Sequence, residues 1–347
     1  IKIKTIVVMN SKLVSVITPC YNSGKFIHRL LETILEQDYP CLEMYVIDDG
    51  SVDNTKEVVK NYITKFDKRG YTLIYIFQEN EGQSVAVNRA LKSIKGEYLV
   101  WPDSDDFYAN SSAISKMVSI LDKSDDSVSM VRCLPIYLNE ETLTLDHKTP
   151  NVIEIYNEYL FEDCLFGKKH FWFVPGDYMV KMSILDKCIR NREIYTEKNA
   201  GQNWQLMLPL LYQYRCITIG DYLYNVVIRE ESHSRGQYKT FEGVCDKLQS
   251  YENTLICTLN NMLFLSLDER EKYIYDIRKK YLLERLNVCL KYHRKEDARI
   301  IRKRLEKDYQ VTLSLTRKLD YLCCLIPGYF LVKQFLSSLK YKYLCCK

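Results

Sequence analysis

The sequence predicts an α/β fold: a largely parallel sheet in the first hundred residues, a mixed second half and a helical C-terminal region. Short apolar runs alternate with helical patterns of about 10–15 residues, which is typical of βαβ units. From about residue 240 onward the apolar spacing becomes helical and the charge basic. The composition, 47% hydrophobic and 27% charged residues over a length of 347, is that of a folded chain with room for more than one domain.

The first half of the chain gives the clearest pattern. Phe26, Leu30 and Ile34 recur at four-residue spacing and therefore share one face of a helix. Asp53 can cap the next helix and Gly70 can end it. The expected strands cover residues 13–18, 42–47, 71–77 and 98–101, and the expected helices cover 26–35, 53–66 and 84–94.

The second half is less regular. The expected strands cover residues 127–133, 178–182, 216–219 and 223–228, and the expected helices cover 156–166 and 201–214. Pro209 should kink the second of these helices. Ser266-x-x-Glu269 forms a capping box that begins a helix in the basic region. We expect one domain over residues 13–235, divided at 107, and a basic helical region over 240–347.

The charge is distributed unevenly along the chain. Residues 271–347 hold 19 Lys and Arg against 8 Asp and Glu, a net of +11, so the remaining residues carry −7 of the total of +4. Lys333, Lys340 and Lys342 lie among aromatic and aliphatic residues, a pattern typical of an interfacial helix on anionic lipid. The alternative is a terminal helix that packs on the main domain. A nucleic-acid arm is not expected, because no nucleic-acid-binding fold is recognisable.

The cysteines and the hydropathy bear on the compartment. Thirteen Cys without a Cys-x-x-Cys pair favour a reducing environment and give no sign of zinc. No apolar run approaches the roughly 20 residues needed to cross a bilayer. We therefore expect a cytoplasmic protein, with the basic tail attaching it peripherally to the inner face of the plasma membrane.

Polar clusters follow three of the expected strands: Tyr21-Asn22, Asp48-Asp49 and Asp103-Ser104-Asp105-Asp106. In a parallel sheet these positions meet at the edge where ligands bind. Closely spaced carboxylates repel one another unless a cation lies among them, so the pattern predicts a divalent metal such as Mg²⁺ or Mn²⁺. The alternative is that these Asp residues cap helices and form turns. A Gly-x-Gly-x-x-Gly motif is absent, which argues against a dehydrogenase.

Four segments in this order resemble family 2 glycosyltransferases. They are VSVITPCYN at 14–22, VIDDGSVDNT at 46–55, NEGQ at 80–83 and GEYLVWPDSDD at 96–106. The resemblance implies a GT-A fold and transfer of a sugar, with inversion, from a nucleoside diphosphate. It favours a UDP-sugar donor and a glycan or lipid-linked acceptor in cell-surface polysaccharide synthesis.

The resemblance also implies roles for individual residues. Pro19 and Tyr21 would line the base pocket, and Asp49 would hold the base. Asp103 and Asp105 would form the metal and ribose site. The implied nucleotide-sugar site comprises Pro19, Tyr21, Asp48, Asp49, Gln83, Asp103 and Arg235, and the implied metal ligands are Asp105, Asp106, Asp103 and His233.

The chain departs from the family where a catalytic Glu-Asp pair is usual. Gln202 and Asn203 occupy the matching positions, and an amide cannot accept a proton at neutral pH. Glu197 or Asp177 would then serve as the general base, or the amides would position an acceptor that is deprotonated by other means. The remaining alternative is a catalytically weak or inactive binding or scaffold protein on the GT-A fold.

Overall fold

The structure, a computed structural model, describes residues 11–169, 171–197, 199–229, 238–312 and 321–322. The chain divides near residue 235 into two compact units, and residues 257–265 belong with the first. The sequence predicts a boundary between 235 and 240, but it does not predict that the chain rejoins the first unit over residues 257–265. Each unit is described by itself below.

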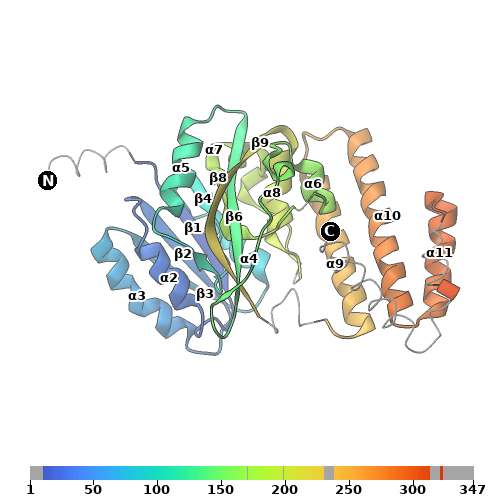
Figure 1. Ribbon diagram of the computed structural model, residues 1–347, viewed down its shortest axis with the longest axis horizontal. Coiled ribbons are helices and arrows are strands. Elements are labelled where there is room, and N and C mark those ends of the chain that lie inside the picture. The colour runs from blue at the N-terminus through green and yellow to red at the C-terminus, as the bar shows by residue number, and fades with distance from the viewer. Residues whose placement is uncertain (1–10, 170, 198, 230–237, 313–320, 323–347) are drawn as a thin grey trace, which may run out of the picture. The chain divides into compact units, whose positions relative to one another are not determined.

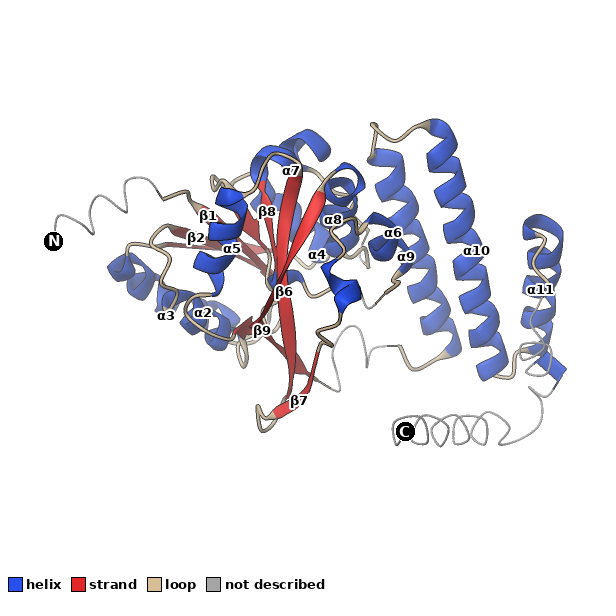
Figure 2. Ribbon diagram, turned by 45° about the horizontal axis from the view of Figure 1, so that its top comes forward, coloured by secondary structure: helices blue, strands red, loops and turns tan. Residues whose placement is uncertain are grey.

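The first unit is built on a mixed sheet with helices on both of its faces (Figures 1 and 2). Its strand order is β3-β2-β1-β4-β8-β6-β9-β5, with β7 paired to β6 outside this path. The parallel part consists of β1 (Val14–Cys20), β2 (Leu42–Asp49), β3 (Thr72–Gln78) and β4 (Tyr98–Val100). The helices between them are α2 (Ile27–Leu35), α3 (Thr55–Arg69) and α4 (Gln83–Leu91).

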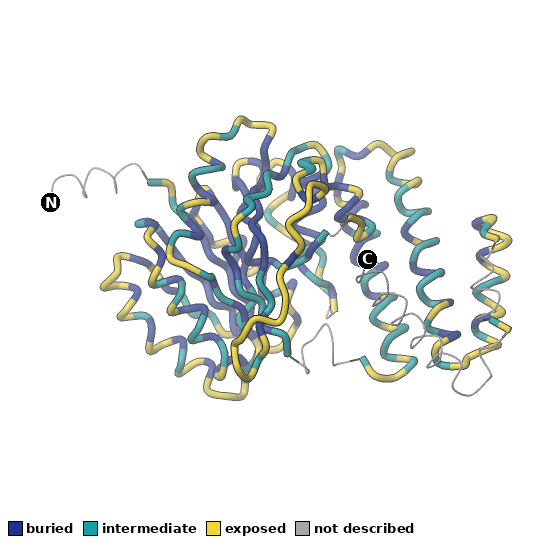
Figure 3. Tube along the Cα trace, viewed as in Figure 1, coloured by how far each residue is buried: buried dark blue, intermediate teal, exposed yellow. Residues whose placement is uncertain are grey.

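The central strands are covered on both sides. Every residue of β1 and β2 is buried, which is why their sequences read as nearly continuous apolar runs (Figure 3). Val14, Val16 and Met44 pack in one core cluster with the buried residues of α2, α3 and α5 (Ala113–Lys123). Helix α4 packs on β1 and β2 outside this cluster. All three helices expected in the first half are present, so the βαβ interpretation is confirmed.

The other strands extend the sheet in mixed directions. They are β5 (Phe107–Tyr108), β6 (Val128–Asn139), β7 (Leu145–Lys148), β8 (Tyr178–Lys181) and β9 (Arg215–Ile228). The helical elements of this half are α6 (Phe161–Phe166), α7 (Met182–Cys188), α8 (Gln202–Gln213) and the 3₁₀ turns η1 (Ile153–Tyr156), η2 (Pro175–Asp177) and η3 (Arg190–Arg192). Strand β8 runs antiparallel to both β4 and β6, whereas β6 and β9 are parallel.

Two expectations for this half need correction. Strand β9 is continuous where the sequence predicts two strands, because register shifts in its pairing with β6 absorb the irregularity around Gly220-Asp221. The helix expected over 156–166 is divided into η1 and α6, because Asn157 and the residues after it leave the helical conformation.

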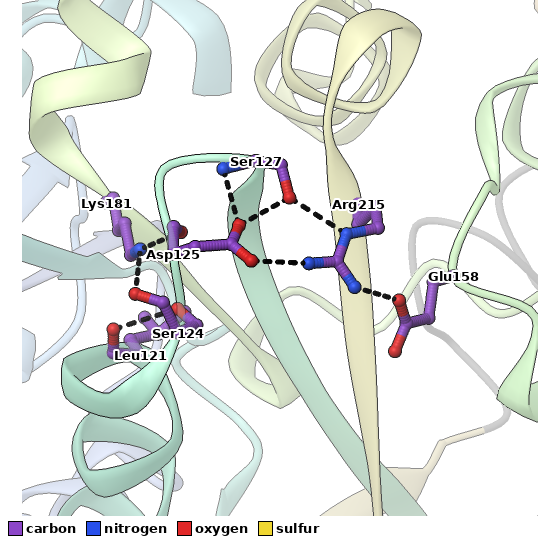
Figure 4. A network of polar contacts seen from close by, with 7 residues as sticks. All are labelled: Leu121, Ser124, Asp125, Ser127, Glu158, Lys181 and Arg215. Atoms are coloured by element: carbon purple, nitrogen blue, oxygen red, sulfur yellow. Dashed lines mark hydrogen bonds and ion pairs between the residues drawn. The ribbon is translucent and has the colours of Figure 1, made fainter.

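A polar network fixes the start of β6 against the start of β9 (Figure 4). The Arg215 guanidinium donates to Glu158 at 2.6 Å, to Asp125 at 3.0 Å and to the Ser127 hydroxyl at 2.9 Å. Lys181 on β8 donates to the Asp125 carbonyl at 2.9 Å. The loop between α5 and β6 thereby holds β8 and β9, the two strands that flank β6.

The second unit is helical. It draws on α9 (Phe241–Asn261), α10 (Leu267–Lys291) and α11 (Lys295–Tyr309), of which α9 also enters the first unit. Ser266 caps α10 by accepting from the Glu269 backbone N–H at 3.3 Å, as the capping box predicts. Leu286, Leu290 and Leu305 belong to a core cluster between α10 and α11. No helix within the described ranges is long and apolar enough to cross a membrane. Lys333, Lys340 and Lys342, on which the prediction of an interfacial helix rests, lie outside the described residues.

Candidate active site

The loops that follow β1 and β2 are joined by hydrogen bonds from backbone N–H groups to side chains. The Ser23 N–H donates to the Thr55 hydroxyl at 2.8 Å, and the Gly24 N–H donates to Asp53 at 3.0 Å. A Cβ on Gly24 would lie 2.0 Å from the Asn54 side-chain oxygen, so a larger residue here would force the Asn54 side chain to move. Tyr21 is 54% exposed at this place, which leaves its ring free to face a ligand.

Asp48 and Asp49 end β2, and both are buried. Asp48 accepts from the Ser51 N–H at 2.8 Å and from the Tyr75 hydroxyl at 2.6 Å. Asp49 accepts from the Gln78 amide at 2.8 Å and from two backbone N–H groups, those of residues 81 and 82, at 2.9 Å each. A carboxylate has about four acceptor positions, so these three donors leave one position of Asp49 untaken. Asp48 shapes the turn after β2.

Asp103, Asp105 and Asp106, which we call the acid cluster, follow β4. The Ser23 and Ser104 hydroxyls are 2.8 Å apart, which brings the acid cluster beside the loop after β1. Asp105 Oδ2 lies 2.5 Å from Arg229 Nη2, and the Gln83 amide donates to Asp103 at 3.4 Å. The carboxylates predicted to meet at one edge of the sheet therefore do so.

Asp106 differs from its neighbours. It is 5% exposed, and its Oδ1 accepts from the Val227 N–H at 2.8 Å, so it holds β9 rather than projecting toward a ligand. With one oxygen so engaged, Asp106 is less suited to hold a cation than Asp103 and Asp105, and its place at the same cation stays a prediction. Burial, together with the charges of Asp105 and Asp103, raises the pKa of Asp106 well above its ordinary value.

The acid cluster provides two carboxylates that fit a divalent cation. Burial and the Asp105 carboxylate raise the pKa of Asp103, which is the effect of crowded charges that a cation would relieve. In the part of the chain that the structure describes, no three His, Cys, Asp or Glu side chains form a complete ion site. Mg²⁺ or Mn²⁺ at a nucleotide needs only one or two carboxylates, because diphosphate oxygens and water complete its shell. Asp103 and Asp105 fit that requirement.

The start of α8 lies at the same edge. The Asn203 side-chain oxygen accepts from the Trp101 indole N–H at 3.1 Å, and its amide donates to the Phe173 carbonyl at 3.1 Å. Trp101 is two residues before Asp103, so Asn203 lies next to the acid cluster. Gln202 is 1% exposed. Both polar groups of the Asn203 side chain are therefore used to hold the start of α8 against Trp101 and Phe173.

Comparison with known protein families identifies the family to which this sheet and its site belong. The model of glycosyl transferase family 2 matches residues 15–188, a range that holds β1, β2, β4 and the acid cluster. The chain belongs to glycosyl transferase family 2. The expectation from the four sequence segments is thereby confirmed.

Curated relatives of this family 2 chain cover it in part. An uncharacterized glycosyltransferase of Rickettsia typhi is 27% identical over 191 residues, which are 53% of this chain and 57% of the relative. The putative teichuronic acid biosynthesis glycosyltransferase TuaG of Bacillus subtilis is 42% identical over 94 residues, which are 27% of this chain and 36% of TuaG. The chain thus spans little more than half the length of the first of these relatives.

Solved structures show that the fold is GT-A. Residues 1–349 of S. aureus TarS, in complex with UDP-GlcNAc, align with a TM-score of 0.54 at 18% identity, over 90% of this chain and 79% of TarS. The mannosyltransferase PcManGT of Pyrobaculum calidifontis, in complex with GDP-Man and Mn²⁺, aligns with a TM-score of 0.53 at 18% identity, over 92% of this chain and 83% of PcManGT. Likeness at this identity concerns the fold alone.

The two carboxylates proposed as substitute bases differ in access. Glu197 is half-buried and accepts from the Tyr195 hydroxyl at 3.0 Å. Asp177 is fully buried, with the Cys133 sulfur 3.6 Å from its Oδ1. A carboxyl group with no exposed surface cannot reach an acceptor hydroxyl, so the structure removes Asp177 from the candidate bases. His233 and Arg235 lie outside the described residues.

Sequence reasoning missed two residues of the site. Gln78 holds Asp49, and Trp101 holds Asn203. Both lie at or just beyond the end of a parallel strand, and that position was the available signal.

Proposed function

We propose that this family 2 chain transfers a sugar from a nucleoside-diphosphate sugar to a glycan or lipid-linked acceptor, with the help of a divalent cation. The observation that carries the proposal is the acid cluster beside the loops that follow β1 and β2. TarS was solved in complex with UDP-GlcNAc, and PcManGT was solved in complex with GDP-Man and Mn²⁺. TuaG is named for teichuronic acid biosynthesis, which supports a role in surface-polysaccharide synthesis.

The donor would lie across the edge at which β1, β2 and β4 end. Tyr21 would stack on the base, with Pro19 behind it, and Asp49 would accept from a base N–H with its remaining acceptor position. Asp103 and Asp105 would hold the cation, which supplies electrostatic stabilisation of the departing diphosphate when bound. Gln83, which donates to Asp103, would orient that carboxylate.

Inverting transfer requires a base for the acceptor hydroxyl, and such a base contributes about 10²–10⁴-fold to the rate. Glu197 is our candidate, since it is partly exposed and precedes α8 by five residues. Gln202 and Asn203 would fix the start of α8 and leave proton transfer to that carboxylate. The absence of an acid at positions 202 and 203 also favours a second candidate function, that of a protein that binds nucleotide sugars without transferring them.

A two-step experiment tests the proposal. Thermal unfolding is measured with UDP-, GDP- and TDP-sugars in the presence of Mn²⁺, where a donor at 100 times its Kd should stabilise by about 2.7 kcal/mol. The stabilising donor is then assayed for hydrolysis and for transfer. Stabilisation with turnover supports the transferase, and stabilisation without turnover supports the binding protein. If none of the nucleotide sugars stabilises the protein, the proposal is wrong.

A further inference from the structure

Arg229 contributes a fixed positive charge to the acid cluster. It follows the last residue of β9, and its Nη2 lies 2.5 Å from Asp105 Oδ2, with both side chains largely buried. Within the described ranges this is the acid cluster's one ion pair. The Arg229 guanidinium carbon also lies 4.6 Å from the centre of the Phe26 ring. Its Nε is buried and has no hydrogen-bond partner.

This guanidinium and a divalent cation compete for the same carboxylate. Asp105 is one of the two carboxylates that the structure leaves for an ion, and Arg229 already occupies its Oδ2. An arginine keeps its charge at any ordinary pH, so it cannot leave by losing a proton. Two cations on one carboxylate lie close enough to repel each other. Binding of the ion at Asp105 therefore favours movement of the guanidinium away from this carboxylate.

Phe26 limits where the guanidinium can go. A cation over an aromatic face is attracted to that face, and this attraction does not depend on Asp105. The displaced side chain therefore stays beside the acid cluster, where a diphosphate brings new negative charge. The planar guanidinium fits two phosphate oxygens at once, and its unpaired Nε–H adds a donor for this purpose.

We propose that Arg229 is a built-in counter-ion that holds Asp105 in the free protein and moves to the diphosphate when cation and donor bind together. This inference rests on the proposed function and assigns Arg229 a place in it. Its consequence is that the cation and the donor bind cooperatively. The cation alone binds weakly because it competes with Arg229 for Asp105, and the donor relieves this competition by accepting the guanidinium.

Calorimetry on the full chain tests the exchange with MnCl₂ alone and then with UDP at saturating Mn²⁺. Arg229→Met keeps an apolar stem on Phe26 and removes the charge, whereas Arg229→Lys keeps the charge. Lys25→Met is the matched control: Lys25 Nζ also lies near the Phe26 ring, at 5.4 Å, but its ion pair is with Glu140. Thermal unfolding confirms that each variant is folded.

Arg229→Met should strengthen the binding of Mn²⁺ alone and weaken the binding of UDP. Mn²⁺ alone should bind about fivefold more tightly than to the wild type, since removal of a competing partly buried ion pair is worth roughly that factor. UDP at saturating Mn²⁺ should bind at least about fivefold more weakly, because the variant cannot make the charge-assisted hydrogen bond to the diphosphate. Arg229→Lys and Lys25→Met should leave Mn²⁺ affinity within about twofold of the wild type.

The outcomes separate this inference from the proposed function. If Mn²⁺ affinity is unchanged or weaker in Arg229→Met while the wild type still binds Mn²⁺ and UDP, the exchange is wrong and the transferase proposal stands. If neither protein binds Mn²⁺, both the exchange and the metal dependence fall. If Lys25→Met tightens Mn²⁺ binding as much as Arg229→Met does, the effect is general charge removal, and the specific role of Arg229 is excluded.

Discussion

Asp49 has a structural role beside the ligand-binding role that we propose for it. Three protein donors hold its carboxylate, and two of them are the backbone N–H groups that lead into α4. The loop before α4 therefore depends on Asp49 whether or not a ligand is present. The proposed contact with the base would use the acceptor position that these three donors leave.

Asp49→Asn should weaken UDP binding both with Mn²⁺ and in EDTA. It should also destabilise the fold by about 1–3 kcal/mol, because the amide N–H₂ faces a buried donor. Calorimetry and chemical unfolding measure the two effects. Asp126→Asn, at an exposed position, is the control and should change neither. A UDP complex with Asp49 more than about 4 Å from every nucleotide atom would exclude the assignment.

Asp177 makes stability depend on pH. Burial raises its pKa well above the ordinary value, so the folded protein holds this proton more tightly than the unfolded chain does. The resulting stabilisation is complete below the unfolded pKa of about 3.9 and is lost as pH rises through the folded pKa.

Asp177→Asn should abolish that pH dependence. Between pH 4 and 7 the free energy of unfolding of the wild type should fall by up to about 1.4 kcal/mol per pH unit relative to the variant. Urea unfolding across this range measures the difference, with Asp126→Asn as the control. Parallel stability curves for the wild type and Asp177→Asn would show that Asp177 does not titrate as described.

These residues also show how far sequence reasoning extends. The places of Asp49 and Asp105 follow from local pattern, because an acidic residue after an apolar run lies at a strand end. The burial of Asp177 and the hydrogen bond from Trp101 to Asn203, which joins residues 102 positions apart, depend on long-range packing. No local pattern carries that information.

Among the elements, the segment between α7 and α8 is fixed along α4. Asn88 exchanges two hydrogen bonds with the backbone of Ile194, at 2.8 and 2.9 Å, and the Ser84 hydroxyl donates to the Ala200 carbonyl at 2.6 Å. Asn191 and Arg192 both have positive φ, at 56° and 51°, a conformation that costs roughly 1–2 kcal/mol per residue. The hydrogen bonds to α4 hold this strained segment, and with it the approach to Gln202.

Asn88→Ala should release the segment. Two buried backbone groups of Ile194 would then have no partner, at about 1–3 kcal/mol each. Sugar transfer should fall more than UDP affinity, since the hydrogen bonds that Asn88 makes lie on the α8 side of the site. Unfolding, calorimetry and a transfer assay report the three quantities, and Ser93→Ala, exposed just beyond α4, is the control. An equal decrease in transfer and in UDP affinity would contradict a role confined to α8.

The elements predicted from sequence are those with a strong local period. The helix over 26–35 corresponds to α2, which buries one regular face, and the strand over 42–47 corresponds to β2, which is an apolar run buried on both faces. The sequence divides β9 into two pieces because Gly220 and Asp221 usually end strands. In the structure the Tyr156 hydroxyl lies 2.6 Å from where a Cβ of Gly220 would be, so glycine serves close packing there.

Across the full chain, the proposed chemistry belongs to the first unit. The family match, the acid cluster and the start of α8 all lie in it. The helical second unit has its own core between α10 and α11. Attachment of the C-terminal segment to a membrane stays a prediction from the charge pattern, since Lys333, Lys340 and Lys342 lie outside the described ranges.

The proposed function depends above all on this sheet edge binding a nucleoside diphosphate through a cation held by Asp103 and Asp105. Calorimetric titration of UDP into the full chain, in Mn²⁺ and then in EDTA, is the decisive test. We expect at least about tenfold weaker binding in EDTA, a decrease in binding free energy of about 1.4 kcal/mol. Asp105→Ala should bind UDP equally weakly in both buffers while its thermal unfolding remains cooperative. Equal UDP affinity of the wild type in Mn²⁺ and in EDTA would contradict the proposed cation site.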